Sequence, residues 1–63
     1  MIELNAFLTP GSVVRHPDRP DWGLGQVQSN VMGKITVNFQ EVGKVVIDGH
    51  RIVLELADSH DAT

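Results

Sequence analysis

The sequence contains no cysteine and no tyrosine, and its other aromatic residues are only one Trp and two Phe among 63 residues. Without cysteine, a disulfide scaffold, a thiolate nucleophile and a cysteine-based zinc finger are excluded. No apolar run is long enough for a membrane-spanning helix. A chain of this length forms one domain at most and buries a small core, which excludes a multi-domain enzyme.

Positive charge is also scarce, because five Lys and Arg stand against eight Asp and Glu, giving a formal net charge of −3. This balance argues against an ordinary DNA-coating protein. The excess of acid comes from Glu3, Asp58 and Asp61, near the two ends of the chain. A secretory signal would be basic where Glu3 stands, and the apolar stretch beside it is too short for one. We therefore expect a cytoplasmic protein.

Valine and isoleucine dominate the apolar residues, and no window of ten or more residues repeats with the helical period. Short apolar runs separated by glycine and proline instead predict an all-β protein. The five predicted strands are Ser12–His16, Gly25–Ser29, Lys34–Phe39, Lys44–Asp48 and Ile52–Leu56. We predict that residues 10–56 form a five-stranded SH3-like (Tudor-like) small barrel, with an open β-meander as the alternative. Residues 1–9 are expected to form an N-terminal arm and residues 57–63 a disordered C-terminal tail.

The hairpin between the third and fourth predicted strands has an expected register. Cross-strand partners share a face of a sheet, so Phe39 is predicted to pair with Val45 and Val37 with Ile47. This register leaves residues 41–43 as a three-residue loop. Gly43 then occupies the position where such loops need a left-handed residue.

Four segments carry a resemblance to known proteins: PGSVVRHP at 10–17, WGLGQV at 22–27, ITVNF at 35–39 and Gly43-Lys44. Together they resemble a small family of uncharacterised bacterial proteins. More distantly, they are similar to the Tudor/SH3-like domain at the C-terminus of PcrA/UvrD-type DNA helicases. They are also similar to the RNA-polymerase-interacting module of CarD and of the transcription-repair coupling factor. The resemblance implies a small barrel that binds a protein partner, either RNA polymerase or a repair factor. The sequence departs from these modules by the loop extension 18–21.

Catalysis and metal binding find little support in the sequence. His16, His50 and His60 lack the spacing of metal ligands. Ser12, His16 and Asp18 lie in no nucleophile elbow, and a barrel of this size is filled by its own side chains. We therefore predict no enzymatic activity, no metal, no cofactor and no small-molecule substrate.

A partner-binding surface is the remaining prediction, and its candidate residues are Arg15, Arg19, Trp22, Lys34 and Lys44. Trp22 follows a proline-rich loop, where it either covers one end of the core or acts as a binding hot spot. Arg15 and Arg19 could join it in a basic-aromatic site for an acidic partner. The predicted function is a protein-interaction module linked to transcription or DNA repair. Weak, sequence-independent nucleic-acid binding is the alternative.

Overall fold

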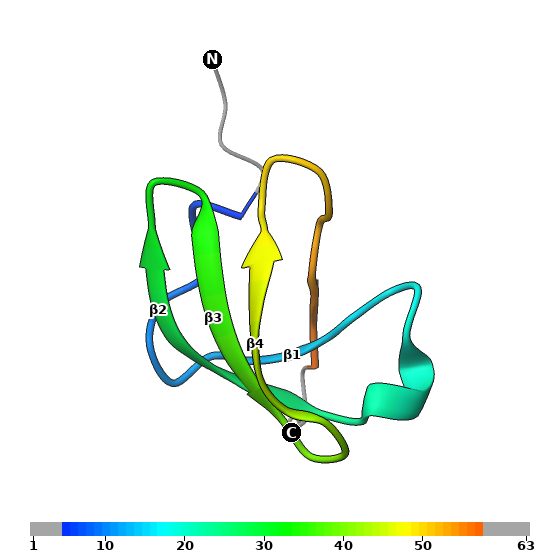
Figure 1. Ribbon diagram of the computed structural model, residues 1–63. Coiled ribbons are helices and arrows are strands. Elements are labelled where there is room, and N and C mark those ends of the chain that lie inside the picture. The colour runs from blue at the N-terminus through cyan, green and yellow to red at the C-terminus, as the bar shows by residue number, and fades with distance from the viewer. Residues whose placement is uncertain (1–4, 58–63) are drawn as a thin grey trace.

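The computed structural model describes residues 5–57, which form an antiparallel sheet of five strands (Figure 1). The strands are β1 (Val13–Arg15), β2 (Gly25–Val31), β3 (Lys34–Phe39), β4 (Gly43–Asp48) and β5 (Glu55–Leu56). A short 3₁₀ helix, η1 (Pro20–Trp22), lies in the loop between β1 and β2, and residues 5–57 contain no α-helix. The predicted all-β fold is confirmed. Residues 1–4 of the expected arm and 58–63 of the expected tail lie outside the described part of the chain.

The sheet is open rather than closed on itself. Its strand order is β4-β3-β2-β1-β5, so β4 and β5 are its two edges. β5 pairs with β1, and no ladder joins it to β4 within the described residues. In Figure 1, β1 runs across the direction of β3 and β4, so the sheet is bent around its core. Five strands are therefore present, although the predicted strand Ile52–Leu56 is reduced to Glu55–Leu56, and closure into a barrel is not seen.

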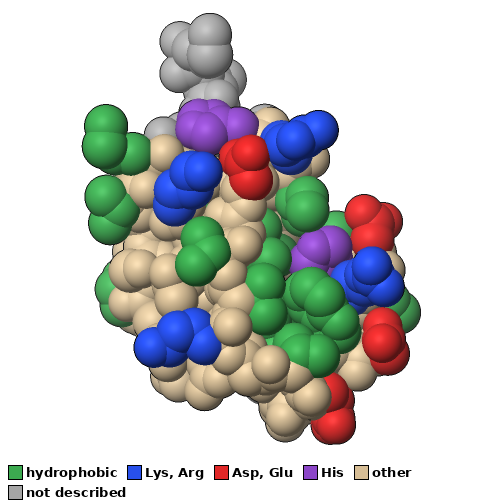
Figure 2. All heavy atoms as spheres, in the orientation of Figure 1, with side chains coloured by type: hydrophobic (Ala, Val, Ile, Leu, Met, Phe, Trp, Pro, Cys, Tyr) green, Lys and Arg blue, Asp and Glu red, His purple; other side chains and the backbone are tan. Residues whose placement is uncertain are grey.

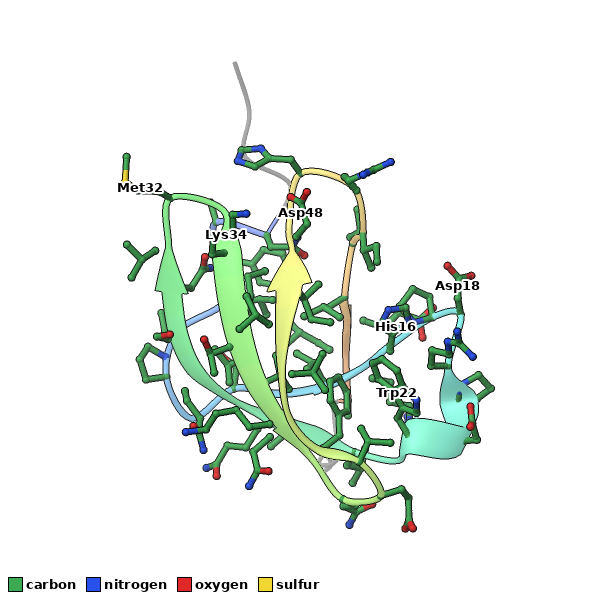
Figure 3. All side chains as sticks on the ribbon, in the orientation of Figure 1. His16, Asp18, Trp22, Met32, Lys34 and Asp48 are labelled. Carbon is green, nitrogen blue, oxygen red and sulfur yellow. The ribbon has the colours of Figure 1, made fainter. Side chains whose placement is uncertain are left out.

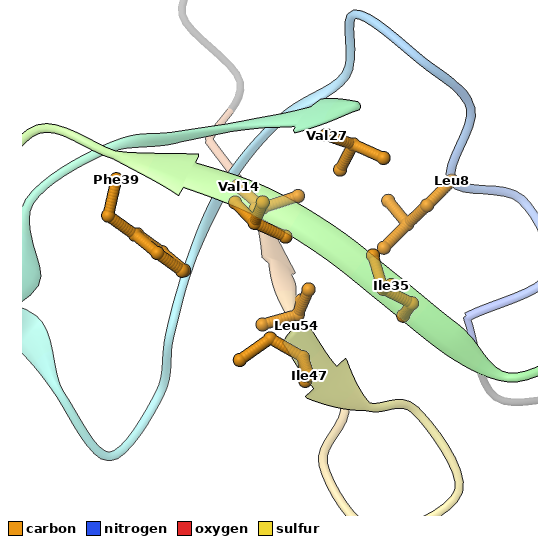
Figure 4. Close-up of a cluster of buried hydrophobic side chains, with 8 residues drawn as sticks. Leu8, Val14, Val27, Ile35, Phe39, Ile47 and Leu54 are labelled. Carbon is orange, nitrogen blue, oxygen red and sulfur yellow. The ribbon is translucent and has the colours of Figure 1, made fainter. Parts of the chain in front are cut away.

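One hydrophobic core fills the concave side of this sheet (Figure 4). Its buried members are Leu8, Val14, Val27, Ile35, Val37, Phe39, Ile47 and Leu54. β3 contributes every second residue to the core, as its alternating sequence predicts. Three further hydrophobic residues, Trp22, Val45 and Ile52, are partly buried and pack against this core from its rim.

The predicted register of the β3–β4 hairpin is wrong by two residues. Phe39 pairs with Gly43 and Val37 with Val45, so the turn consists of residues 40–42. A shift of two residues keeps every side chain on its face, so hydrophobic alternation cannot distinguish the two registers. The left-handed conformation expected of Gly43 is confirmed by its φ of 79°. This conformation lets the chain enter β4 at Gly43 itself rather than one residue later.

Asn5 and Leu8, which the sequence placed in the N-terminal arm, are buried in the structure. The Asn5 Nδ2 donates hydrogen bonds to the carbonyl oxygens of Gly49 (3.0 Å) and Ile52 (2.9 Å). Its Oδ1 accepts one from the backbone N–H of Leu54 (3.1 Å). One amide side chain thus fixes the start of the described chain to its last segment. We call this group of three hydrogen bonds the Asn5 clamp.

The β2–β3 hairpin has a two-residue turn, Met32-Gly33, between the paired residues Val31 and Lys34. Both turn residues have positive φ, 51° for Met32 and 82° for Gly33. This is the arrangement of a type I′ turn, whose twist suits a hairpin and whose first position favours asparagine. Methionine has no such preference, and its side chain here is 86% exposed.

Met32→Asn is therefore expected to raise the free energy of unfolding by about 0.5–1 kcal/mol, because asparagine tolerates the left-handed conformation. Urea denaturation followed by tryptophan fluorescence measures the change. Val31→Asn, at the exposed neighbour inside β2, is the control and should not stabilise the protein. Equal effects of the two substitutions would contradict the explanation that methionine is disfavoured in the left-handed conformation of residue 32.

Candidate functional site

The loop that follows β1 is shaped by short-range hydrogen bonds. His16, which is buried, accepts a hydrogen bond at Nδ1 from the backbone N–H of Asp18 (3.1 Å). The backbone N–H of Arg19 donates to the His16 carbonyl oxygen (3.2 Å) and closes the turn. Pro20 then begins η1, where its fixed φ suits the first helical position and its missing N–H has no role. The loop extension 18–21 therefore carries Arg19 and leads directly into Trp22.

Trp22 lies at the centre of an aromatic group at the rim of the core (Figure 3). Its ring meets the His16 ring edge-on, with centroids 5.0 Å apart, and the Phe39 ring likewise at 5.2 Å. The Arg19 Cζ atom lies 5.7 Å from the centroid of the Trp22 ring, within the range of a cation–π contact. We call these four residues the Trp22 cluster. The indole therefore covers one end of the core, which is the first of the two roles expected for it, and also supports a cation at the surface.

The far end of the loop is fixed to the β3–β4 turn. The backbone N–H of Glu41 donates to the Trp22 carbonyl oxygen (3.1 Å), and the backbone N–H of Gln40 donates to the Leu24 carbonyl oxygen (2.9 Å). The Gln40 side chain makes a second hydrogen bond with Leu24, because its Oε1 accepts from the Leu24 N–H (3.0 Å). Gly23 has a φ of 78°, and a Cβ atom there would lie 2.8 Å from the Gln40 Oε1. These contacts join the segment that carries Trp22 to the β3–β4 turn.

Two of the five candidate residues face an acidic neighbour across the sheet. Arg15 on β1 pairs with Glu55 on β5. Lys34 on β3 pairs with Asp48 on β4. Directly paired residues point to the same face, where opposite charges attract each other. Arg15 and Lys34 therefore each share a face of the sheet with an acidic cross-strand neighbour.

The remaining basic candidates lie apart from one another. Lys44 on β4 pairs with the neutral Asn38, while Arg19 lies over Trp22 in the loop. Figure 2 shows the basic side chains of this face as separate patches, with acidic side chains among them. The structure thus brings together Arg19 and Trp22 from the predicted set, and places Arg15, Lys34 and Lys44 on the strands.

An open depression of about 530 Å³ lies on the outer face of the sheet near the β3–β4 turn. Its polar side chains come from Gln26, Asn38, Gln40 and Glu41, and Glu41 is its one ionisable lining residue. Gln26 and Asn38 are cross-strand partners on β2 and β3. Sequence reasoning missed this depression, because its residues come together only through the register of the two strands.

The described residues hold no group of three or more His, Asp or Glu side chains placed to share a metal ion. His60, considered above as a ligand, lies outside residues 5–57. No helix among the described residues is long and apolar enough to cross a membrane.

Comparison with known proteins identifies a family for this chain. No curated protein and no solved structure is similar to this chain at a significant level. Residues 8–57, which include all five strands and the whole Trp22 cluster, match a family described as "Protein of unknown function (DUF3553)". The matched segment covers most of the 63 residues, and the chain therefore belongs to the DUF3553 family.

Proposed function

We propose that this protein is a non-enzymatic protein-interaction module that binds its partner through the Trp22 cluster. The observation that carries the proposal is the Arg19–Trp22 pair, held on a loop that is fixed at both ends. Tryptophan and arginine are the residues most enriched among binding hot spots. A surface that is already ordered loses little conformational entropy on binding, so more of its contact energy becomes affinity.

The partner that we propose is a protein of the transcription or DNA repair machinery, with RNA polymerase as the first candidate. Support comes from the resemblance of segments 10–17, 22–27 and 35–39 to the polymerase-interacting and helicase modules named above. We propose that the bent sheet, with β1 between β2 and β5, is an SH3-like barrel that stays open between its edge strands β4 and β5. Such a module would act in the cytoplasm, without a cofactor.

Arg19→Glu is expected to weaken capture of the partner at least tenfold, because it removes the cation of the cluster and introduces repulsion. The immobilised wild type and variant are compared for the proteins they retain from bacterial lysate, and for binding of purified bacterial RNA polymerase. Arg51→Glu is the matched control, because it makes the same charge change at an exposed residue in the turn after β4. If both variants retain the same proteins in equal amounts, the Trp22 cluster is not the binding site.

Trp22→Ala is less informative alone, because the ring also packs on the core and its loss destabilises the fold. Arg19 is exposed, so its substitution leaves the core intact.

Labelled single- and double-stranded DNA, titrated at two salt concentrations, tests the alternative function. With the basic residues scattered, we expect dissociation constants weaker than ~10⁻⁴ M even at low salt. Tight binding that falls steeply with salt would favour nucleic acid as the partner.

A further inference from the structure

The outer edge of β4 presents backbone groups that the sheet does not use. The N–H of Gly49 donates to the Gly33 carbonyl oxygen (2.7 Å), and this bond continues the β3–β4 ladder beyond Asp48. Backbone groups of every second residue point to the same side of a strand. Val45, like Gly49, therefore directs its N–H and C=O toward β3, and Lys44 and Val46 direct theirs away from the sheet.

Asp48 confirms this direction. Asp48 lies two residues after Val46 and four after Lys44, so its backbone groups point to the same side of β4. Its carbonyl oxygen accepts hydrogen bonds from the backbone N–H groups of Arg51 (3.1 Å) and Ile52 (3.2 Å), outside the ladder. The turn that follows β4 thus satisfies the outward carbonyl of Asp48. Among residues 5–57, no backbone hydrogen bond from outside the ladder reaches Lys44 or Val46.

β4 lacks most of the features that usually protect an edge strand. Protected edges are very short, or carry charged side chains such as lysine, a proline, a bulge or an inward-pointing charge. β4 carries one lysine, Lys44, but it has six residues and no proline, its register with β3 is unbroken, and its inward residues at 45 and 47 are valine and isoleucine. The opposite edge, β5, is protected by its length of two residues. The sheet therefore has one edge that is open to pairing.

Apolar side chains lie at the rim of the core on the inward side of this edge. The hydrophobic residues that pack on the core while remaining partly exposed are Trp22, Val45 and Ile52. Figure 2 shows hydrophobic side chains exposed together on the side of β4 that faces segment 51–56. We define the β4 seam as these three side chains together with the outward backbone groups of Lys44 and Val46.

We propose that the β4 seam binds an extended peptide segment of the partner protein, which joins the sheet as a sixth strand beside β4. This inference rests on the proposed protein-binding function and names the kind of segment that is bound. The peptide's backbone hydrogen-bonds to Lys44 and Val46, which gives affinity with little dependence on sequence. Its alternate side chains point toward Trp22 and Ile52, so the segment has apolar residues at every second position. Two outward-facing residues of β4 pair with a strand of about four or five residues.

The probe is a linear peptide selected on the wild-type protein from a phage-displayed library of random dodecapeptides. The synthetic peptide is titrated into the full ¹⁵N-labelled chain, and amide hydrogen exchange is measured by NMR. We expect the amides of Lys44 and Val46 to exchange at least tenfold more slowly at saturation, because the new strand takes up their N–H groups. The amide of Val45, already bonded to β3, should change less.

Val45→Lys tests the apolar part of the seam by placing a cation on its inward side. We expect it to weaken peptide binding at least tenfold. Val31→Lys is the matched control, because it introduces the same charge at an exposed valine of β2 and should change binding less than threefold. Urea denaturation tests whether both variants are folded. If Val45→Lys is unfolded, Val45→Thr provides a milder change of polarity at the same site.

The outcomes separate this inference from the proposed function. Failure to select any peptide overturns the inference, and so does a bound peptide that leaves the Lys44 and Val46 amides unprotected. Partner capture that depends on Arg19 can succeed in either case, so the proposed function is judged independently. These two amides could instead exchange slowly in the free protein at high concentration, with a dimer seen in sedimentation. That result would assign the seam to a second copy of the chain and overturn the proposal that it binds a peptide of a partner protein.

Discussion

Asn5→Ala is expected to lower the free energy of unfolding by about 3 kcal/mol or more. The Asn5 side chain is 4% exposed and makes all three bonds of the Asn5 clamp. Its loss leaves the carbonyl oxygens of Gly49 and Ile52 and the N–H of Leu54 without this partner. Each buried polar group left unsatisfied costs about 1–3 kcal/mol. Domains of this size have a total stability of roughly 3–9 kcal/mol, so this loss removes about a third or more of the free energy of unfolding.

Urea denaturation followed by Trp22 fluorescence measures this effect, and two asparagine substitutions serve as controls. Asn38→Ala removes an exposed side chain and should change stability by less than about 0.5 kcal/mol. Asn30 is half-buried and donates to the carbonyl oxygens of Asn5 and Leu8, so Asn30→Ala should have an intermediate effect. If Asn5→Ala costs no more than Asn38→Ala, the clamp does not hold the fold together.

Gly25→Ala is expected to cost about 2–3 kcal/mol, although it adds only one methyl group. A Cβ atom at Gly25 would lie 2.5 Å from the Val37 Cγ1 and 2.7 Å from two ring atoms of Phe39. Both neighbours are fully buried, so neither can move aside without disturbing the core. Gly25 has no positive φ, so the expected cost comes from overlap and not from backbone strain.

Gly11→Ala is the control for the loss of a glycine without overlap. Gly11 has a φ of 97°, and no atom lies within 4 Å of the position its Cβ would take. Its substitution should cost about 1–2 kcal/mol through backbone strain alone. Thermal and urea denaturation of both variants give the comparison. A smaller effect at Gly25 than at Gly11 would show that the core around Phe39 adapts to the extra methyl group.

Strand positions could be predicted where hydrophobic alternation is strict. Stabilising contacts made by single polar side chains could not. Ile35, Val37 and Phe39 alternate with polar residues, and β3 was predicted at its observed bounds. Asn5 gave no signal, because one polar residue in an unpatterned segment resembles solvent-exposed chain. Its role depends on backbone groups 44–49 residues away, which no local pattern reports.

The candidate site was predictable to a similar degree. The proline-rich loop identified Arg19 and Trp22 as neighbours, and the structure places the arginine over the indole. The acidic partners of Arg15 and Lys34 could not be derived, because they depend on a cross-strand register that alternation leaves ambiguous by two residues. The open edge of β4 was also beyond the sequence, because strand patterns leave both a barrel and an open β-meander possible and do not say which strand lies at an edge.

The pairing of β5 with β1 determines the order in which the sheet can form. Its partners Val14 and Leu56 are separated by most of the chain, whereas the turn at Met32-Gly33 joins its strands with two residues. Closing the longer loop costs about 2–3 kcal/mol more conformational entropy. The meander β2–β4 can therefore assemble first, and β5 docks late. During synthesis, β1 keeps a bare edge until residue 56 has left the ribosome, and that interval is when the chain is most exposed to wrong pairing.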